Sequence, residues 1–360
     1  MKSILFVLPS LCPGGAERVF ATLLNHFPHD RYQLHLALVY KSVDRFYEIP
    51  AHVKVYELSV SRVVLAAMPL LRLVWRIEPV AIFSALGHLN MLVIALKWLY
   101  PHHPGVFAYE GSTVSRNIAA EPHSLVMGIF YRFLYPRATR VICLCRAMLD
   151  DLQKHFAVPR RKMVVIYNPL DSEEIRQKAV QDGNPFEKAG PGPHIVCVGR
   201  LDPAKGYDEV LKALKGWTDR YPDLQLWLVG DGPLRQALAE QAGELDVTQH
   251  LNFVGFQRNP FRWVSHADLF LLASRYEGLP NALMEAIVLE CPVWVKKHPG
   301  GAGEILAITG LGDRATPCLD LEQRLFEKPG RECAAKAEKV FQARAVVEQY
   351  LQLIETGSCG

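Results

Sequence analysis

The sequence of 360 residues lacks several patterns that would assign it quickly to a class of protein. Its eight cysteines include no Cys-x-x-Cys pair, which argues against a disulfide framework or a zinc site and fits the reduced thiols of a cytoplasmic protein. No run of about 18 apolar residues occurs, so the sequence predicts no transmembrane helix. The net charge of +3 is small, whereas a nucleic-acid-binding protein usually shows a larger and more clustered basic excess. We therefore expect no nucleic-acid partner.

Familiar catalytic motifs are missing as well. The sequence contains no His-Glu-x-x-His, no Walker loop and no Asp-x-Asp of the kind that binds a divalent metal. The adjacent pair His102-His103 lies between two prolines, which indicates a surface loop rather than a metal site. No motif in the sequence therefore points to a bound metal ion.

Apolar residues, by contrast, are plentiful and regularly arranged. Half of the residues are hydrophobic, which is enough for two cores in a chain of this length. Short apolar runs alternate with amphipathic stretches, and this alternation predicts parallel sheets with helices on both faces. We expect strands at residues 3–9, 33–40, 80–84, 105–109, 139–144, 194–199, 224–229, 251–254, 268–272 and 292–295. We expect helices at residues 15–27, 69–77, 88–99, 122–135, 206–218, 233–243 and 280–290, and an amphipathic tail at 333–355.

Residues 172–193 interrupt this alternation. They are rich in Gln, Asp, Gly, Asn and Pro, a composition typical of a linker. The sequence therefore predicts two doubly wound α/β domains, with a ligand in the cleft between them. We place the first domain at residues 1–175 and the second at residues 190–340.

The segment from Ser274 to Glu285 (SRYEGLPNALME) carries the most informative pattern. An apolar run just before it predicts a buried strand, and Pro280 suits the first turn of a helix because its missing N–H would have no partner there. Glu277 is then expected on the strand-to-helix loop, and Glu285 on the first turns of the helix. Free backbone N–H groups from Asn281 to Leu283 would point into the same space, where an anion or a sugar hydroxyl could bind.

Two further strand-to-helix loops have a similar character. In residues 199–206 (GRLDPAKG), the cations Arg200 and Lys205 suit a diphosphate, and the next helix N-terminus adds to the positive field. The alternative is an ordinary pair of solvated loop charges. Gly14 and Gly15 would let a ligand approach the backbone closely, although a Gly-Gly turn is often no more than a turn.

Together and in this order, residues 14–18, 198–206 and 274–285 resemble the motifs of family 4 glycosyltransferases of the GT-B fold. The likeness covers nearly the whole chain and includes residues 168–171 (NPLD), where the first domain ends. It implies a hexosyltransferase that moves a hexose or N-acetylhexosamine from a nucleotide sugar, commonly a UDP-sugar. The resemblance further implies retention of configuration, and neither a metal ion nor another cofactor.

The family architecture is two Rossmann-like domains that face a central cleft. By the resemblance, residues 1–175 would form the acceptor domain and residues 190–340 the nucleotide-sugar donor domain. A C-terminal helix at residues 341–360 would cross back to pack on the first domain.

The resemblance also assigns roles to individual residues. Arg200 and Lys205 would hold the diphosphate and stabilise the leaving group. Glu285 would accept hydrogen bonds from the ribose hydroxyls, and Glu277 would lie against the donor sugar. The expected catalytic residues are Glu277, Arg200 and Lys205. The expected donor-binding residues are Gly14, Gly15, Arg200, Lys205, Glu277, Asn281, Ala282, Leu283 and Glu285.

Three places depart from the family pattern. Many members carry a His after the fourth strand of the first domain, where this chain has EGST at residues 110–113. Residues 294–298 (WVKKH) stand where the family usually has small or acidic residues, and residues 310–332 match only loosely. The candidate acceptor residues are Glu110, Ser112 and Arg116.

Relatives of this type often build lipid-linked bacterial glycans, so we expect a glycan or lipid-linked acceptor of O-antigen, lipopolysaccharide or capsule synthesis. We expect a cytoplasmic protein with peripheral contact to the inner face of the membrane. Residues 69–76 (PLLRLVWR) and 125–137 (LVMGIFYRFLYPR) mix bulky apolar, aromatic and Arg residues and could rest on an anionic membrane surface. The alternative for each is an ordinary core helix with one wet edge.

Two alternatives to a transferase remain open. A sugar-nucleotide epimerase of the same fold would turn over UDP-sugar without an acceptor. A catalytically silent partner would bind a sugar nucleotide without turnover, and the intact set of charged motif residues argues against this.

Overall fold

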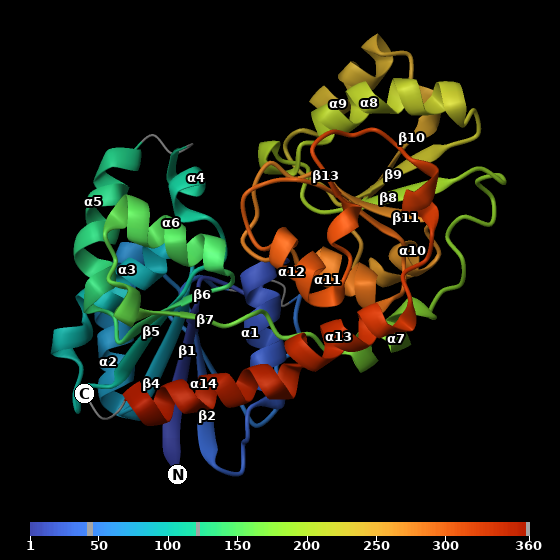
Figure 1. Cartoon of the computed structure of the whole chain (residues 1–360). Coiled ribbons are helices and arrows are strands. Elements are labelled where there is room, and N and C mark those ends of the chain that lie inside the picture. Colours follow the sequence, from blue (N-terminus) through green and yellow to red (C-terminus); the bar gives the residue numbers. More distant parts are fainter. Residues whose placement is uncertain (42–45, 120–122, 358–360) are drawn as a thin grey trace. The chain divides into compact units, whose positions relative to one another are not determined.

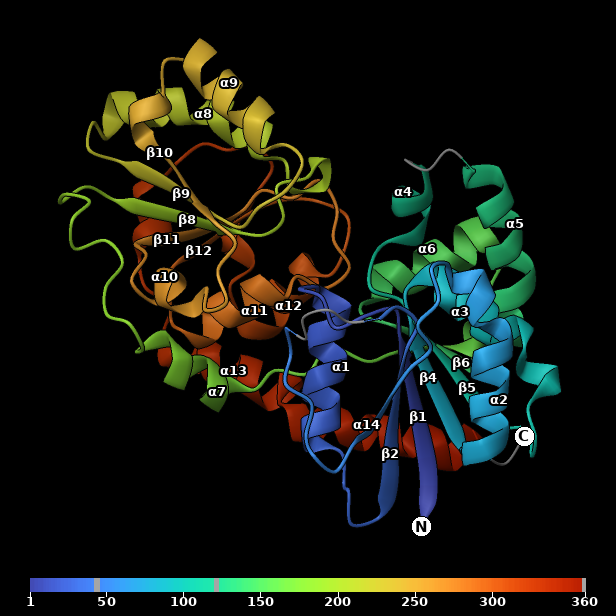
Figure 2. The ribbon, with the colours of Figure 1, turned by 180° about the vertical axis from the view of Figure 1, so that it is seen from behind.

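The computed structural model describes residues 1–41, 46–119 and 123–357 (Figures 1 and 2). The chain divides into two compact units, each built on a parallel sheet covered by helices, which confirms the predicted α/β fold class. Among the described residues, no helix combines the length and the apolar character needed to cross a membrane. The units are Met1–Pro169 with Ala343–Gly360 (unit 1) and Leu170–Gln342 (unit 2).

The sheet of unit 1 has seven strands in the order β3-β2-β1-β4-β5-β6-β7. The order reverses between β1 and β4, and α/β proteins usually bind ligands at the carboxyl ends of strands beside such a reversal. The strands are Lys2–Leu8 (β1), Tyr32–Leu38 (β2), Lys54–Glu57 (β3), Ala81–Ala85 (β4), Gly105–Tyr109 (β5), Arg140–Cys143 (β6) and Met163–Val165 (β7). The helices are Gly15–His26 (α1), Ala67–Ile77 (α2), Gly87–Ala95 (α3), Val114–Ala119 (α4), Ser124–Leu134 (α5), Arg146–Phe156 (α6) and Ala343–Gly357 (α14).

Aromatic side chains fill the core of unit 1 and tie its last helix to the sheet. Phe83 of β4 stacks on Phe6 of β1 and on Phe107 of β5, with ring centroids 5.3 Å and 4.7 Å apart. Tyr350 of α14 is buried, and its ring lies 5.3 Å from that of Phe83. The helix α14 is therefore part of the core of unit 1, although it follows unit 2 in the sequence.

The sheet of unit 2 has six strands in the order β10-β9-β8-β11-β12-β13. Its order reverses between β8 and β11, the two strands that precede the motif loops. The strands are His194–Val198 (β8), Gln225–Val229 (β9), Leu251–Gly255 (β10), Leu269–Leu272 (β11), Val293–Lys296 (β12) and Ala315–Thr316 (β13). The helices are Ser172–Ala179 (α7), Tyr207–Arg220 (α8), Arg235–Glu244 (α9), Phe261–Ser265 (α10), Asn281–Val288 (α11), Ala302–Thr309 (α12) and Arg331–Phe341 (α13).

The prediction of a linker is wrong over its first part, because Ser172–Ala179 forms α7. The carboxylate of Asp171 caps this helix by accepting a hydrogen bond from the N–H of Glu174 at 3.0 Å. Arg176 forms an ion pair of 2.5 Å with Glu338 of α13. Only two of the eight residues of α7 are buried, so its apolar periodicity is too weak to indicate a helix.

The chain passes between the units at Pro169–Leu170, ahead of the expected boundary region at 175–190, and returns after Gln342. The tail predicted at residues 333–355 is two helices, α13 in unit 2 and α14 in unit 1. Gln342 has an extended backbone (φ −52°, ψ 131°), which ends α13.

Candidate functional site

Two loops of unit 2 meet where the strand order of its sheet reverses. The loop after β8 carries Arg200 and Lys205, and the loop after β11 carries Glu277. Because β8 and β11 are paired parallel neighbours, both loops leave the same edge of the sheet. The N–H of Arg275 donates to the carbonyl of Ala204 at 2.7 Å and joins the loops directly. The structure therefore brings together two motifs that lie about seventy residues apart in the sequence. They meet where α/β proteins usually bind ligands, at the carboxyl ends of strands beside a reversal of strand order.

The centre of this site is an ion pair between Lys205 and Glu277. The Nζ of Lys205 lies 2.5 Å from Oε1 of Glu277, and the hydroxyl of Ser274 donates to the same oxygen at 2.6 Å. The side chains of Lys205 and Glu277 are 22% and 16% exposed, so the pair is mostly shielded but still reachable from solvent. Such an arrangement can place a phosphate beside the cation and a hydroxyl group beside the carboxylate.

Arg200 is on the same loop but has different surroundings. Its side chain is exposed, and no carboxylate in the described part of the chain is ion-paired with it. Arg200 is therefore available to bind an anion, whereas Lys205 already has a partner.

A second set of ion pairs holds the two loops in place. Arg275 lies 2.7 Å from Asp208 and 3.1 Å from Glu209, both at the start of α8, and it also donates to the carbonyl of Pro203 at 2.6 Å. The hydrogen bond with Asp208 raises the pKa of Arg275. Lys296, at the end of β12, is paired with Glu209. These contacts fix the positions of the loops on the sheet edge.

Two glycines permit the close approach of the backbones around the site. Gly206 has φ +69° and Gly300 has φ +132°, both in the left-handed region that favours glycine. A Cβ atom at Gly206 would overlap the carbonyl of Ala273, and one at Gly300 would overlap the carbonyl of Glu277. Neither position can therefore take a larger residue without moving a motif loop.

The helix α11 begins directly after Pro280, as the sequence predicts. Asn281 and Ala282 are half-buried at its start. The prediction of a free N–H at Leu283 is wrong, because this group donates to the carbonyl of Pro280 at 3.1 Å and closes the first turn. Glu285 is buried on α11, with 4% of its surface exposed. Its contact with a ribose stays a prediction.

His298 is a polar residue of the site that the sequence analysis did not select. The loop after β12 is held against Glu277, whose N–H donates to the carbonyl of Pro299 at 3.3 Å, and the N–H of Gly301 donates to Gly278 at 2.7 Å. Both ring nitrogens of His298 are buried and have no hydrogen-bond partner among the described residues. Burial lowers the pKa of His298, against the influence of Glu277, so the ring is neutral at pH 7. The only sequence signal was a departure from the family pattern at residues 294–298.

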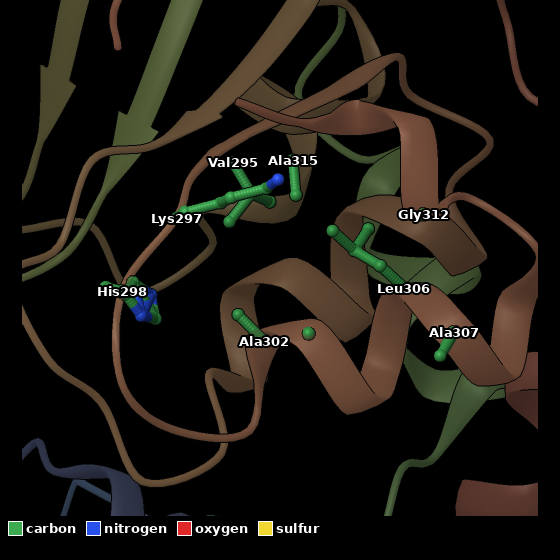
Figure 3. Close-up of a pocket in the computed structure, with 9 residues that line it drawn as sticks. Val295, Lys297, His298, Ala302, Leu306, Ala307, Gly312 and Ala315 are labelled. Carbon is green, nitrogen blue, oxygen red and sulfur yellow. The ribbon is translucent and has the colours of Figure 1, made fainter. Parts of the chain in front are cut away.

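A cavity of about 390 Å³ adjoins this loop (Figure 3). Figure 3 shows Lys297 and His298 on the loop after β12, and Ala302 and Leu306 on α12. The remaining wall is mostly apolar and small, so Lys297 and His298 are the polar residues of the lining. The lining residues are Val295, Lys297, His298, Ala302, Gly303, Leu306, Ala307, Gly312 and Ala315.

In unit 1, Gly14 and Gly15 follow β1 beside the reversal of its strand order. Gly14 precedes α1 and Gly15 is its first residue, and the carboxylate of Glu17 fills the space that a Cβ of Gly14 would need. Burial raises the pKa of Glu17. The hydroxyl of Tyr47 donates to the carbonyl of Gly14 at 3.0 Å. The glycine pair thus allows tight local packing, and its approach to donor phosphates stays a prediction.

Glu110 lies inside unit 1 rather than on its surface, with 3% of the residue exposed. Asn90 donates to its Oε1 at 3.1 Å, and the hydroxyl of Tyr135 donates to the same oxygen. Burial raises the pKa of Glu110 to about 8, so this carboxyl group carries a proton at pH 7. Ser112 is half-buried on the following loop and Arg116 is exposed on α4. Of the three predicted acceptor residues, solvent therefore reaches Ser112 and Arg116 but hardly reaches Glu110.

Comparison with known proteins places both units in one family. Residues 13–174 match the family model described as Glycosyltransferase Family 4, and residues 181–310 match the one described as Glycosyl transferases group 1. A Campylobacter jejuni protein is 28% identical over 85% of this chain and 83% of its own length. That relative is named N-acetylgalactosamine-N,N'-diacetylbacillosaminyl-diphospho-undecaprenol 4-alpha-N-acetylgalactosaminyltransferase.

Solved structures show the same fold. The crystal structure of Anabaena HepE in complex with UDP has a TM-score of 0.78 at 20% identity and covers 99% of this chain and 100% of its own. The sucrose-phosphate synthase of Thermosynechococcus elongatus has a TM-score of 0.79 at 15% identity, with 99% of each chain covered. The fold, the motif loops and the matches over both units show that this chain belongs to the family 4 glycosyltransferases, enzymes of the GT-B fold.

Proposed function

We propose that this glycosyltransferase moves a hexose or an N-acetylhexosamine from a UDP-sugar to a glycan acceptor, with retention of configuration and without a metal ion. The observation that carries the proposal is the cluster of Lys205, Glu277 and Ser274 at the reversal of strand order in unit 2. The cluster offers a cation for a diphosphate and a carboxylate for sugar hydroxyls. The UDP bound to HepE, a protein of the same fold, supports a uridine nucleotide.

The proposed chemistry follows from where negative charge develops. When the bond between sugar and phosphate breaks, charge builds on the departing diphosphate, and fixed cations there stabilise the transition state more than the ground state. Arg200 is exposed and without an ion-pair partner in the described part of the chain, so it can turn to the diphosphate. Lys205 would divide its hydrogen bonds between Glu277 and a phosphate oxygen. The two cations would then supply the positive charge that a metal ion provides elsewhere.

We assign three further groups to the donor. Glu285 would accept hydrogen bonds from the ribose, and the start of α11 at Asn281 and Ala282 would lie near the sugar. A neutral His298 donates from one ring nitrogen and accepts at the other, so a sugar hydroxyl or phosphate oxygen would satisfy nitrogens that otherwise have no partner in the described structure. The contact between its loop and Glu277 supports this placement.

For the acceptor, we propose a lipid-linked saccharide of bacterial cell-surface glycan synthesis, such as O-antigen, lipopolysaccharide or capsule. The name of the Campylobacter jejuni relative describes an undecaprenol-linked diphosphosugar acceptor, and the likeness extends over most of both chains. Because such a substrate is anchored in a membrane, the enzyme would work at a membrane surface, and we propose the cytoplasmic face.

A panel of UDP- and GDP-sugars, incubated with the full chain and a bacterial lipid extract, tests the proposal. We expect release of UDP together with a lipid that gains one sugar, and an unchanged rate in EDTA. Free epimerised UDP-sugar without a modified lipid would instead indicate an epimerase, and binding without turnover would indicate a silent partner. Loss of activity in EDTA that Mn²⁺ restores would contradict the metal-free mechanism.

A further inference from the structure

Unit 1 exposes an unusual amount of apolar surface. Twelve of the fifteen large apolar side chains that are exposed in the described part of the chain come from three segments of this unit. The segments are residues 63–77, which form a short 3-10 helix (η1, Val63–Ala66) and α2, residues 86–99, which contain α3 and a second 3-10 helix (η2, Lys97–Leu99), and α5. We call this surface the apolar face. Its members are Val64, Leu65, Met68, Trp75, Leu86, Trp98, Leu99, Leu125, Val126, Ile129, Phe130 and Phe133.

The three segments adjoin one another in unit 1. The helix α3 contacts α5, η1 and η2. The indole N–H of Trp75 donates to the carbonyl of Leu99 at 3.0 Å, and Nζ of Lys97 donates to the carbonyl of Arg137, just beyond α5, at 3.2 Å. Figures 1 and 2 show α5, α3 and α2 one after another along one side of unit 1.

The helix α5 shows most clearly that this surface lacks a partner. Only Tyr131 of its eleven residues is buried, although most of them are apolar. A surface helix normally turns its apolar side to the core. Leu125, which is 85% exposed, and Phe133, which is 58% exposed, do not follow this rule. An apolar area of this kind marks a place where another molecule binds.

The charge around the apolar face identifies the kind of partner. These segments and their flanking residues (61–78, 86–99 and 123–137) carry six Lys or Arg residues and one acidic residue, Glu78, whereas the whole chain is nearly balanced at 40 basic and 37 acidic residues. The exposed Arg62, Arg72 and Arg132 have no ion-pair partner among the described residues. The six residues are Arg62, Arg72, Arg76, Lys97, Arg132 and Arg137.

We propose that the protein binds an anionic lipid bilayer through the apolar face. Bulky aromatic and aliphatic side chains beside unpaired arginines suit the boundary between headgroups and acyl chains, where apolar groups leave water and cations meet lipid phosphates. Trp75, Trp98, Phe130 and Phe133 would enter this boundary. The bilayer would be the surface that carries the lipid-linked acceptor of the proposed transfer. Only this role in the reaction rests on the proposed function.

Vesicle flotation with the full chain tests the inference, without sugar nucleotide or acceptor lipid. We expect binding to vesicles that contain phosphatidylglycerol, weaker binding as salt is added, and little binding to phosphatidylcholine alone. Combined Leu125→Gln, Ile129→Gln and Phe133→Gln should weaken binding about tenfold or more, since three apolar groups no longer leave water. Val180→Gln is the matched control, because Val180 is 81% exposed on unit 2, and it should bind like the unchanged chain.

Unchanged circular dichroism and UDP affinity would show that the triple variant is folded. Equal vesicle binding by the triple variant and the unchanged chain would overturn the inference. A concentration-dependent dimer that the triple variant abolishes, with no vesicle binding, would also overturn it and would identify a second copy as the partner. Vesicle binding by a protein that transfers no sugar would support lipid binding through the apolar face and refute the proposed transfer.

Discussion

Glu277 in unit 2 and Glu110 in unit 1 each follow the carboxyl end of a buried strand in a parallel sheet, although the two strands are not equivalent. Glu277 follows β11, which borders the reversal of strand order in unit 2, whereas Glu110 follows β5, one strand beyond the reversal between β1 and β4 in unit 1. Both residues were expected to contact substrate. Their partners differ, since Glu277 meets the ammonium of Lys205 and the hydroxyl of Ser274. Glu110 meets only neutral donors and is almost completely buried.

These different surroundings indicate which of the two carboxylates is suited to ligand binding. A carboxylate held by a cation at a partly exposed loop can exchange hydrogen bonds with a polar substrate. One in an apolar interior takes up a proton and becomes part of the packing, as the raised pKa of Glu110 indicates. The proposed donor site of unit 2 therefore contains an ion pair, whereas the carboxyl group of Glu110 in unit 1 is neutral at pH 7.

The largest effect should come from removing the cations of the proposed donor site. We expect Arg200→Ala and Lys205→Ala each to lower the rate of transfer by about 10²–10³-fold, because charge on the leaving diphosphate loses a fixed partner. Lys212→Ala, an exposed residue on α8, is the control and should keep its rate. Near-normal rates in both site variants would show that these cations do not act in transfer. The ion pair of Glu277 would then give no reason to treat it differently from Glu110.

The next effect concerns the backbone behind Glu277. Gly300→Ala should lower the free energy of unfolding by about 1–3 kcal/mol, since a Cβ would meet the carbonyl of Glu277 at a strained φ. Gly303→Ala, on α12 with open space around it, should instead change stability by less than about 1 kcal/mol. Denaturant unfolding of both variants checks this, and equal stabilities would show that the loop contact does not constrain Glu277.

The stability of the protein should respond to the proton on Glu110. Its folded pKa of about 8 exceeds the ordinary 4.5, so the unfolded chain loses the proton first as the pH rises. The stabilisation is complete below pH 4.5 and decreases up to pH 8, by at most about 1.4 kcal/mol per pH unit. Glu110→Gln should reduce the change in the free energy of unfolding between pH 4.5 and pH 8, whereas Glu244→Gln, an exposed control, should not. Identical slopes in all three proteins would mean that Glu110 is ionised in the folded state.

The smallest effect should come from His298. His298→Leu should raise the KM for the donor roughly three- to tenfold, the cost of about one hydrogen bond, and His298→Gln should partly restore it. His266→Leu, an exposed histidine on the same unit, is the control. An unchanged KM in His298→Leu would remove this residue from the donor site.

Much of the fold could be predicted because its signals are local. Apolar runs predicted ten of the thirteen strands in the described part of the chain, and the glycines and Pro280 predicted the loops that follow them. The strands β3, β7 and β13 have only four, three and two residues and were not predicted, because runs this short give no clear pattern. Glu110 could not be placed, because its burial depends on Tyr135 and Asn90, which reach it from other elements of the fold. The N–H of Leu283 is used by a turn whose geometry no residue type specifies, and α7 has too few apolar residues to be recognised. The nitrogens of His298 gained significance only once the structure showed them to be buried without partners.

The most direct test of the account compares kcat at pH 7 for Glu277→Gln and Glu110→Gln with that of the unchanged enzyme. Both substitutions keep the shape of the side chain and remove its ability to carry charge. We expect Glu277→Gln to lower kcat by about 10²-fold or more, whereas Glu110→Gln, which replaces an already neutral group, should change it by less than about threefold. A larger loss in Glu110→Gln than in Glu277→Gln would contradict the assignment of the charged chemistry to unit 2.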